Sequence, residues 1–131
     1  MKGYLQVYTG DGKGKTTAAV GLAVRAVGAG LTVAFVQFVK GGTRSSELGV
    51  LEGLGVHVER PATRSTGLLG DGITDEDRAA ASEALALARE VVSSLEFDFI
   101  VLDEVCVAMR YELVAEADVL ALLDERFPGI D

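Results

Sequence analysis

The chain has 131 residues, of which 49% are hydrophobic and 24% are charged, with two prolines and one cysteine. This length suits a single domain spanning 1–131, and this hydrophobic content is typical of a folded chain rather than a disordered one. A lone cysteine, Cys106, excludes an internal disulfide and makes a reducing cytoplasm the expected location.

The charges are unevenly distributed along the chain. Residues 1–64 contain eight basic and four acidic side chains, whereas residues 65–131 contain four basic and sixteen acidic ones, and the formal net charge is −8. Nucleic acid is therefore not an expected partner, because neutralisation of backbone phosphates dominates that affinity. A membrane is not expected either, since no apolar stretch approaches the ~20 residues that span a bilayer. Binding of a small anion by the basic residues of 1–64 stays open as a function.

Strand and helix patterns alternate from the first residues to the last. In chain order, the pattern predicts a strand over 3–8, a helix over 16–27, an almost continuously apolar strand over 31–39, a short helix over 46–54, a strand over 56–58, a helix from about 75 to 95, a strand over 97–102 and a helix over about 115–127. Such alternation requires a mainly parallel sheet with helices on both faces, a three-layer α/β sandwich. Ligands in these folds bind beyond the carboxyl ends of the strands.

The helix after residue 74 has the clearest local signals. Thr74 is expected to cap it, with Asp77 reaching back to complete the cap. Its apolar positions follow helical spacing and predict one buried stripe. The stripe consists of Ala81, Ala84, Leu85, Ala88, Val91, Val92 and Leu95.

The most informative segment joins the first strand to the first helix and reads TGDGKGKTT over residues 9–17. Glycines leave backbone N–H groups free to point at phosphate oxygens, and the following helix presents its positive end to the same anion. Lys15 would neutralise phosphate charge and the Thr16 hydroxyl would bind Mg²⁺. The usual phosphate-loop pattern has glycine where this chain has Thr9, so Gly10 is interpreted as the first glycine of a shortened or shifted loop. The alternative, a flexible turn, is disfavoured because strand, loop and helix occur in order.

A second motif ends the strand over 97–102. Asp103 and Glu104 follow this strand, and a carboxylate at such a position beside a phosphate loop can hold Mg²⁺ directly or through water. Glu104 is favoured for direct contact, with Asp103 acting from behind it. The alternative is a carboxylate that only starts a helix.

Other residues have two alternative roles each. Arg25 could reach a phosphate across the loop, although pairing with surface carboxylates is favoured from the sequence alone. Lys40, Arg44 and Glu47 follow the second strand and could line the same mouth. For His57 and Cys106, packing roles are favoured. Leu68 and Leu69 lie in the long loop over 61–74, where they either anchor the loop or face an apolar ligand.

Taken together, the segments GDGKGKTTAA (10–19), GLAVRA (21–26), QFVKG (37–41) and LDE (102–104) resemble the phosphate-loop ATP:corrinoid adenosyltransferases. The resemblance covers nearly the whole chain and implies a phosphate-loop NTPase-like (RecA-like) fold. It implies transfer of the 5′-deoxyadenosyl group of ATP to the Co(I) of a reduced corrinoid, with release of triphosphate. It further implies Mg²⁺, a homodimer, a cytoplasmic enzyme and a possible flavoprotein reductant.

The resemblance also implies roles for individual residues. Lys15 and Glu104 would be catalytic, Thr16 and Glu104 would hold the metal, and Arg25 would join the loop around the triphosphate. The loop residues expected to bind ATP are Gly10, Asp11, Gly12, Lys13, Gly14, Lys15, Thr16 and Thr17.

The chain departs from the family pattern in three places. Asp11 stands where the family usually has asparagine, and the 65–72 segment lacks the aromatic residues of the family's corrinoid-facing loop. Family members also continue into a further strand and helix that these 131 residues do not include. Two other functions stay open: a phosphate-loop kinase of nucleoside type, with Arg60 and Arg64 in its lid, and a regulatory domain that only binds nucleotide.

Overall fold

The computed structural model describes residues 4–39, 46–62 and 72–126. Its sheet has three parallel strands in the order β2-β1-β3, formed by Val33–Gln37 (β1), His57–Glu59 (β2) and Phe99–Asp103 (β3). Ala34 pairs with His57 on one side and with Ile100 on the other. Because all three strands run the same way, their carboxyl ends meet at one edge of the sheet, where any site of this fold class is expected.

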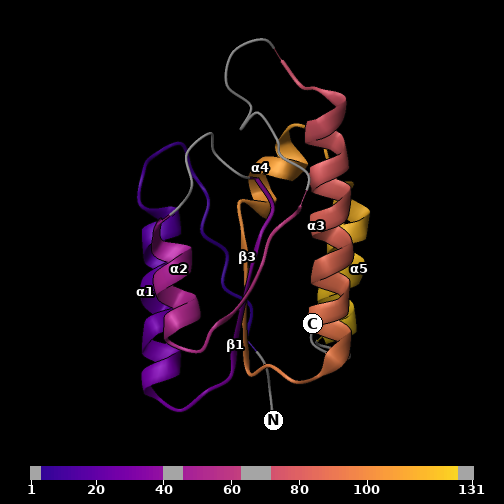
Figure 1. Cartoon of the computed structure of the whole chain (residues 1–131). Helices are drawn as coiled ribbons and strands as arrows, with labels where there is room; N and C mark the ends of the chain where they lie inside the picture. Colours follow the sequence, from indigo (N-terminus) through magenta and orange to yellow (C-terminus); the bar gives the residue numbers. More distant parts are fainter. Residues whose placement is uncertain (1–3, 40–45, 63–71, 127–131) are drawn as a thin grey trace.

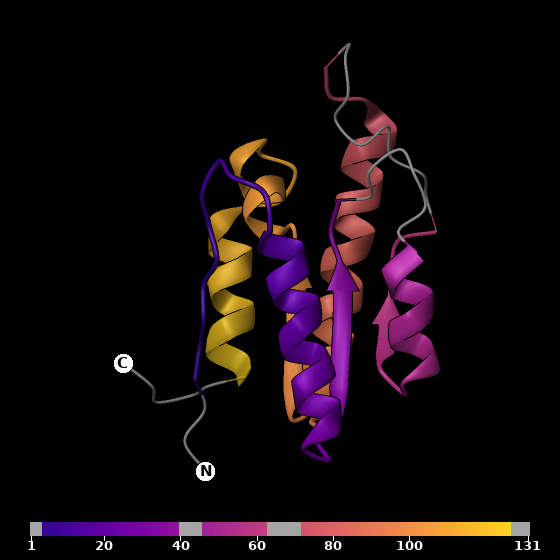
Figure 2. The same cartoon turned by 90° about the vertical axis from the view of Figure 1, so that its left-hand side faces the viewer.

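Helices cover both faces of this sheet. In Figure 1, α1 (Lys15–Gly28) and α2 (Ser46–Gly53) lie on one face, and α3 (Asp75–Ser94) and α5 (Glu116–Arg126) lie on the other. Figure 2 shows the same layers from the α1 side. The predicted three-layer α/β arrangement with a parallel sheet is therefore confirmed.

The central strand β1 explains why two helical layers are needed. All five of its residues are buried, and successive side chains point to opposite faces. Val33 and Phe35 pack with α1 and α2, whereas Ala34 and Val36 pack with α3 and α5. An almost continuously apolar strand leaves neither face suited to water, which is the physical basis of the sequence prediction.

Helix α3 begins as its sequence predicts. The Thr74 hydroxyl accepts a hydrogen bond from the Asp77 backbone N–H at 3.2 Å, and the Asp77 carboxylate accepts one from the Thr74 backbone N–H at 2.9 Å. The predicted stripe is buried as far as Val92. The prediction is wrong for the last residue of the stripe, Leu95. This residue ends the helix in the left-handed conformation at φ 56°, which turns its side chain outward to 73% exposure.

The predicted strand over 3–8 is also wrong for the described residues 4–8. This segment has no regular secondary structure, and Tyr4, Leu5, Val7 and Tyr8 are exposed. A strand needs a hydrogen-bonding neighbour, and among the described residues β1 pairs with β2 and β3 only. In Figure 2 the segment rises along the outside of the layers to the loop before α1.

One helix was missing from the sequence prediction. Helix α4, Val105–Arg110, follows β3 directly at the carboxyl edge of the sheet. Cys106 lies in it and is half-buried. Within the described ranges, none of the helices has the length and apolar character to cross a membrane.

Candidate functional site

The loop before α1 depends on glycine at two points. Gly10 has φ 133° and Gly14, the residue that precedes α1, has φ 109°. Side chains make this backbone region costly, whereas glycine adopts it freely. The two glycines therefore let residues 10–14 curl back over the start of α1.

The first turn of α1 is arranged to receive an anion. The N–H groups of a helix's first turn lack partners within the helix, and the helix dipole makes this end positive. Gly14 offers no side chain to cap them, and the first turn carries no acidic residue. By contrast, α3 has a side-chain cap and three acidic residues in its first turn. The start of α1, unlike that of α3, is thus suited to phosphate.

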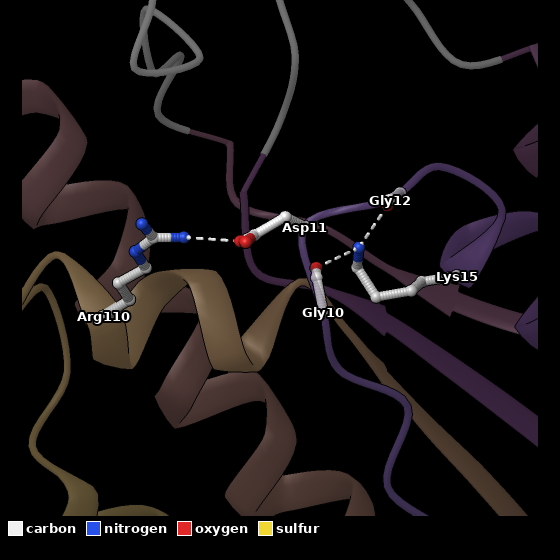
Figure 3. Close-up of polar contacts among 5 residues, drawn as sticks. All are labelled: Gly10, Asp11, Gly12, Lys15 and Arg110. Atoms are coloured by element: carbon white, nitrogen blue, oxygen red, sulfur yellow. Dashed lines mark hydrogen bonds and ion pairs between the residues drawn. The ribbon is translucent and has the colours of Figure 1, made fainter.

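Lys15 folds back into this loop. Its Nζ donates hydrogen bonds to the carbonyl oxygens of Gly10 and Gly12, each at 2.6 Å (Figure 3). The ammonium group is consequently held beside the N-terminus of α1, where it adds a full positive charge to the helix's partial one. Phosphate oxygens that approach the N-terminus of α1 would be attracted by the Lys15 ammonium group and by the helix dipole.

Two carboxylates at the end of β3 face the same helix. The Thr16 hydroxyl donates to Asp103 Oδ1 at 3.0 Å and lies 3.5 Å from Glu104 Oε1. Glu104 has φ 63°, a strained conformation for a residue with a side chain, and it starts α4 without capping it. Its side chain instead lines the hollow above the loop, so the interpretation as a simple helix-start carboxylate is not what the geometry favours.

Burial has a strong effect on the electrostatics of Asp103, which is 7% exposed. The pKa of its carboxyl group is raised from 3.8 to about 6 as the net of three effects: loss of solvation raises it most, the Thr16 hydrogen bond lowers it, and the charges of Glu104 and Glu47 raise it. Glu47 therefore acts on the site through its charge, although it is not among the residues that line the hollow described below. The carboxylate pair is a place where a cation would be stabilised.

These parts surround a hollow of ≈ 270 Å³. It is lined by Gly12, Lys13, Gly14, Lys15, Thr16, Thr17 and Glu104. Gly10 and Asp11 belong to the same loop. Arg25 does not approach it: this exposed residue lies in the last turn of α1, ten residues from Lys15 and about 15 Å away along the helix axis. Lys40, Arg44 and the Leu68–Leu69 pair lie outside the described residues.

The donor atoms fit Mg²⁺. Mg²⁺ prefers oxygen ligands and is usually held by one or two carboxylates together with phosphate oxygens of the substrate, rather than by an all-protein cage. Thr16, Asp103 and Glu104 supply a hydroxyl and two carboxylates of this kind. In the three ranges that the structure describes, no group of three or more His, Cys, Asp and Glu side chains is placed so that it could hold a metal ion.

Sequence reasoning missed one contact at the site. Arg110 Nη1 lies 3.5 Å from Asp11 Oδ1 and so joins the end of α4 to the loop (Figure 3). The two residues are far apart in the chain, and no spacing rule connects them. The departure at Asp11 was the only available signal, because an acidic residue in an anion-binding loop requires a compensating charge.

Fold and loop together place the chain among the α/β proteins of the phosphate-loop class. Residues 1–131 match the model of the family described as ATP:corrinoid adenosyltransferase BtuR/CobO/CobP, and the chain belongs to this family. The resemblance seen in the sequence motifs is therefore confirmed, and the kinase and regulatory alternatives are not favoured.

Curated relatives agree with this assignment. The chain is 38% identical over 126 residues to a corrinoid adenosyltransferase of Escherichia coli, covering 95% of this chain and 63% of the relative. It is 37% identical over 128 residues to corrinoid adenosyltransferase CobA of Salmonella typhimurium, covering 98% and 64%. A Pseudomonas aeruginosa corrinoid adenosyltransferase is 31% identical over 131 residues, covering 95% and 62%. The chain thus spans somewhat less than two thirds of the length of these relatives.

Proposed function

We propose that the protein transfers the 5′-deoxyadenosyl group of ATP to the cobalt of a reduced corrinoid and releases triphosphate. The observation that carries the proposal is the phosphate loop with its facing Asp-Glu pair, in a chain that matches an ATP:corrinoid adenosyltransferase family from end to end. In this reaction the lone pair of Co(I) forms a bond to C5′ of ATP. The C5′–O bond breaks, and the triphosphate leaves with its electron pair.

Transfer of the adenosyl group to Co(I) does not require proton transfer by a side chain. Co(I) is already nucleophilic, so no side chain has to deprotonate it, and the site needs no general base. The protein must orient ATP, compensate the charge that develops on the leaving triphosphate and exclude water. Lys15 and the first-turn N–H groups of α1 would compensate that charge, with Lys13 and Thr17 lining the same hollow.

Mg²⁺ would be held by Thr16 and Glu104, and when bound it supplies positive charge to the phosphate oxygens. Asp103 is buried behind them and accepts the Thr16 hydrogen bond, so its role would be to orient that hydroxyl. Gly10, Asp11, Gly12 and Gly14 would shape the loop. Arg25 stays a prediction from the family resemblance, because its place on α1 gives it no reach to the loop of the same chain.

The homodimer, the flavoprotein reductant and the cytoplasmic location are likewise proposals that rest on the resemblance. Of these, the location has some support from composition, since Cys106 is the only cysteine. The corrinoid would meet the protein at the 65–72 segment, of which residues 65–71 lie outside the described residues.

The test is an anaerobic incubation of the protein with Mg-ATP and chemically reduced cobalamin, with all products identified by mass spectrometry. We expect adenosylcobalamin and triphosphate in equal amounts, and neither product from Lys15→Ala. Formation of ADP without a cobalt–carbon product would indicate a kinase instead. Bound but unchanged ATP would indicate a domain that only binds nucleotide.

A further inference from the structure

Helix α4 contacts the phosphate loop region at both of its ends. At its start, Glu104 Oε1 lies 3.5 Å from the Thr16 hydroxyl, and at its end Arg110 Nη1 lies 3.5 Å from Asp11 Oδ1. Between these ends, Val105 and Met109 pack against the core under α3 and α5. One short helix is therefore preceded by a carboxylate that lines the hollow and ends in a guanidinium beside the loop, and Figure 3 shows the second of these contacts, between Arg110 and Asp11.

The contact between Arg110 and Asp11 has an electrostatic consequence. Asp11 lies between Gly10 and Gly12, whose carbonyl oxygens accept the Lys15 hydrogen bonds, and its side chain is 95% exposed. A carboxylate at this position repels the triphosphate that the loop is proposed to bind. Arg110 brings an opposite charge within ion-pair distance and so offsets the repulsion.

We propose that Arg110 is a positioning residue for nucleotide binding, which neutralises Asp11 and ties the loop over 10–12 to α4. The inference rests on the proposed function only in taking ATP as the ligand of the loop. Arg110 acts through Asp11 and needs no contact with ATP itself. The ion pair is exposed, with 73% of the Arg110 side chain accessible, so the effect must be modest and sensitive to salt.

The test is a double-mutant cycle on the affinity for Mg-ATP, measured by isothermal titration calorimetry. Arg110→Ala leaves Asp11 without compensation and is expected to weaken binding about two- to five-fold at low salt. Asp11→Asn removes the carboxylate whose repulsion Arg110 already offsets, and is therefore expected to leave the affinity close to the wild-type value. The double variant is expected to return close to the wild-type affinity, because the penalty of Arg110→Ala exists only while Asp11 is charged.

Two controls separate this from a structural effect. Arg110→Lys keeps the charge and is expected to retain most of the affinity. Arg89→Ala removes an arginine of comparable exposure, 52%, whose partner is Asp118 on α5, and is expected to leave ATP affinity unchanged. The Arg110→Ala loss is expected to shrink at 0.5 M salt, and thermal unfolding of each variant shows whether its fold is intact.

Unchanged affinity in Arg110→Ala would overturn the inference, and so would a loss that persists in the double variant or at high salt. ATP binding without adenosyl transfer by the wild-type protein would refute the proposed function while leaving the cycle fully interpretable. If the wild-type protein bound no ATP, both proposals would fall together.

Discussion

Asp103 shows how a single side chain sets a cost of folding at the candidate site. Its pKa of about 6, against 3.8 for an unperturbed group, means that the folded state holds the proton more tightly than the unfolded chain does. The contribution of this group to stability is therefore fully present below about pH 4 and is lost as the pH rises through about 6. A buried carboxylate that is kept ionised near neutral pH suits the orientation of Thr16 toward a cation.

Replacement of Asp103 by asparagine tests this cost directly. Because one pKa unit corresponds to about 1.4 kcal/mol, Asp103→Asn is expected to raise the free energy of unfolding at pH 8 by up to about 3 kcal/mol. Near pH 4 the gain is expected to fall below about 1 kcal/mol, since Asp103 is then protonated in the folded state and only about half ionised in the unfolded chain. Denaturant unfolding at the two pH values measures it, with Asp124→Asn, at an exposed position of α5, as the control. An equal gain at both pH values would show that burial of charge is not the cause.

At the scale of one element, α1 offers two glycines for comparison, one just before its first residue and one within it. Gly14 precedes it with φ 109°, whereas Gly21 lies in its middle with ordinary helical geometry, and an added Cβ would meet nothing within 4 Å at either position. Gly21→Ala is expected to stabilise the protein by about 0.5–1 kcal/mol, because alanine is the better helix former. Gly14→Ala is expected to cost about 1–3 kcal/mol and to weaken ATP binding, because its backbone angle is strained for alanine.

Thermal unfolding and ATP titration of these two variants check the prediction. Because an added Cβ is unobstructed at both positions, the difference in stability between the two variants reports backbone conformation alone. A Gly14→Ala variant as stable as Gly21→Ala would mean that the loop can adopt another backbone path.

Helix α3 gives a second test at this scale. Thr74→Ala removes the side-chain half of the capping box and is expected to lower the free energy of unfolding by about 1 kcal/mol, whereas Thr74→Ser keeps the hydroxyl and is expected to lose little. Urea unfolding of the two variants measures the difference. Equal losses would place the contribution of Thr74 in its methyl group rather than in the hydrogen bond.

The elements also show what the sequence could and could not predict. The loop before α1, the cap at Thr74 and the burial of β1 depend on neighbouring residues, and each was predicted. The strand over residues 3–8 was wrong because extended propensity says nothing about whether a hydrogen-bonding edge is present. Helix α4 was missed because six residues give too few turns for a periodic signal and Glu104 gives no cap. Arg110 reaches Asp11 only through the folded structure.

At the scale of the whole molecule, the site joins parts that no single element holds together. The loop and α1 come from the start of the chain, whereas the carboxylates come from the end of β3, and the Thr16–Asp103 hydrogen bond connects them. A ligand that bridges both sides binds the folded state and not the unfolded chain. It must then stabilise the entire domain by mass action.

Thermal unfolding should therefore report nucleotide and metal binding together. Mg-ATP at about 100 times its dissociation constant is expected to add about 3 kcal/mol to the free energy of unfolding. For a domain of this length, that corresponds to a rise in Tm of roughly 10 °C. ATP with a chelator is expected to give a smaller rise, because the repulsion between triphosphate and the pair Asp103–Glu104 is then uncompensated.

Thr16→Val separates the two contributions, because it removes the hydroxyl while nearly preserving shape and leaves Lys15 and the N-terminus of α1 in place. We expect this variant to keep the smaller rise produced by ATP alone and to lose the additional rise produced by Mg²⁺. If Mg²⁺ raised the Tm of Thr16→Val as much as that of the wild-type protein, the metal would have to be held without the Thr16 hydroxyl. The proposed division of labour, in which Lys15 and α1 bind the phosphates while Thr16 and Glu104 bind the cation, would then be wrong.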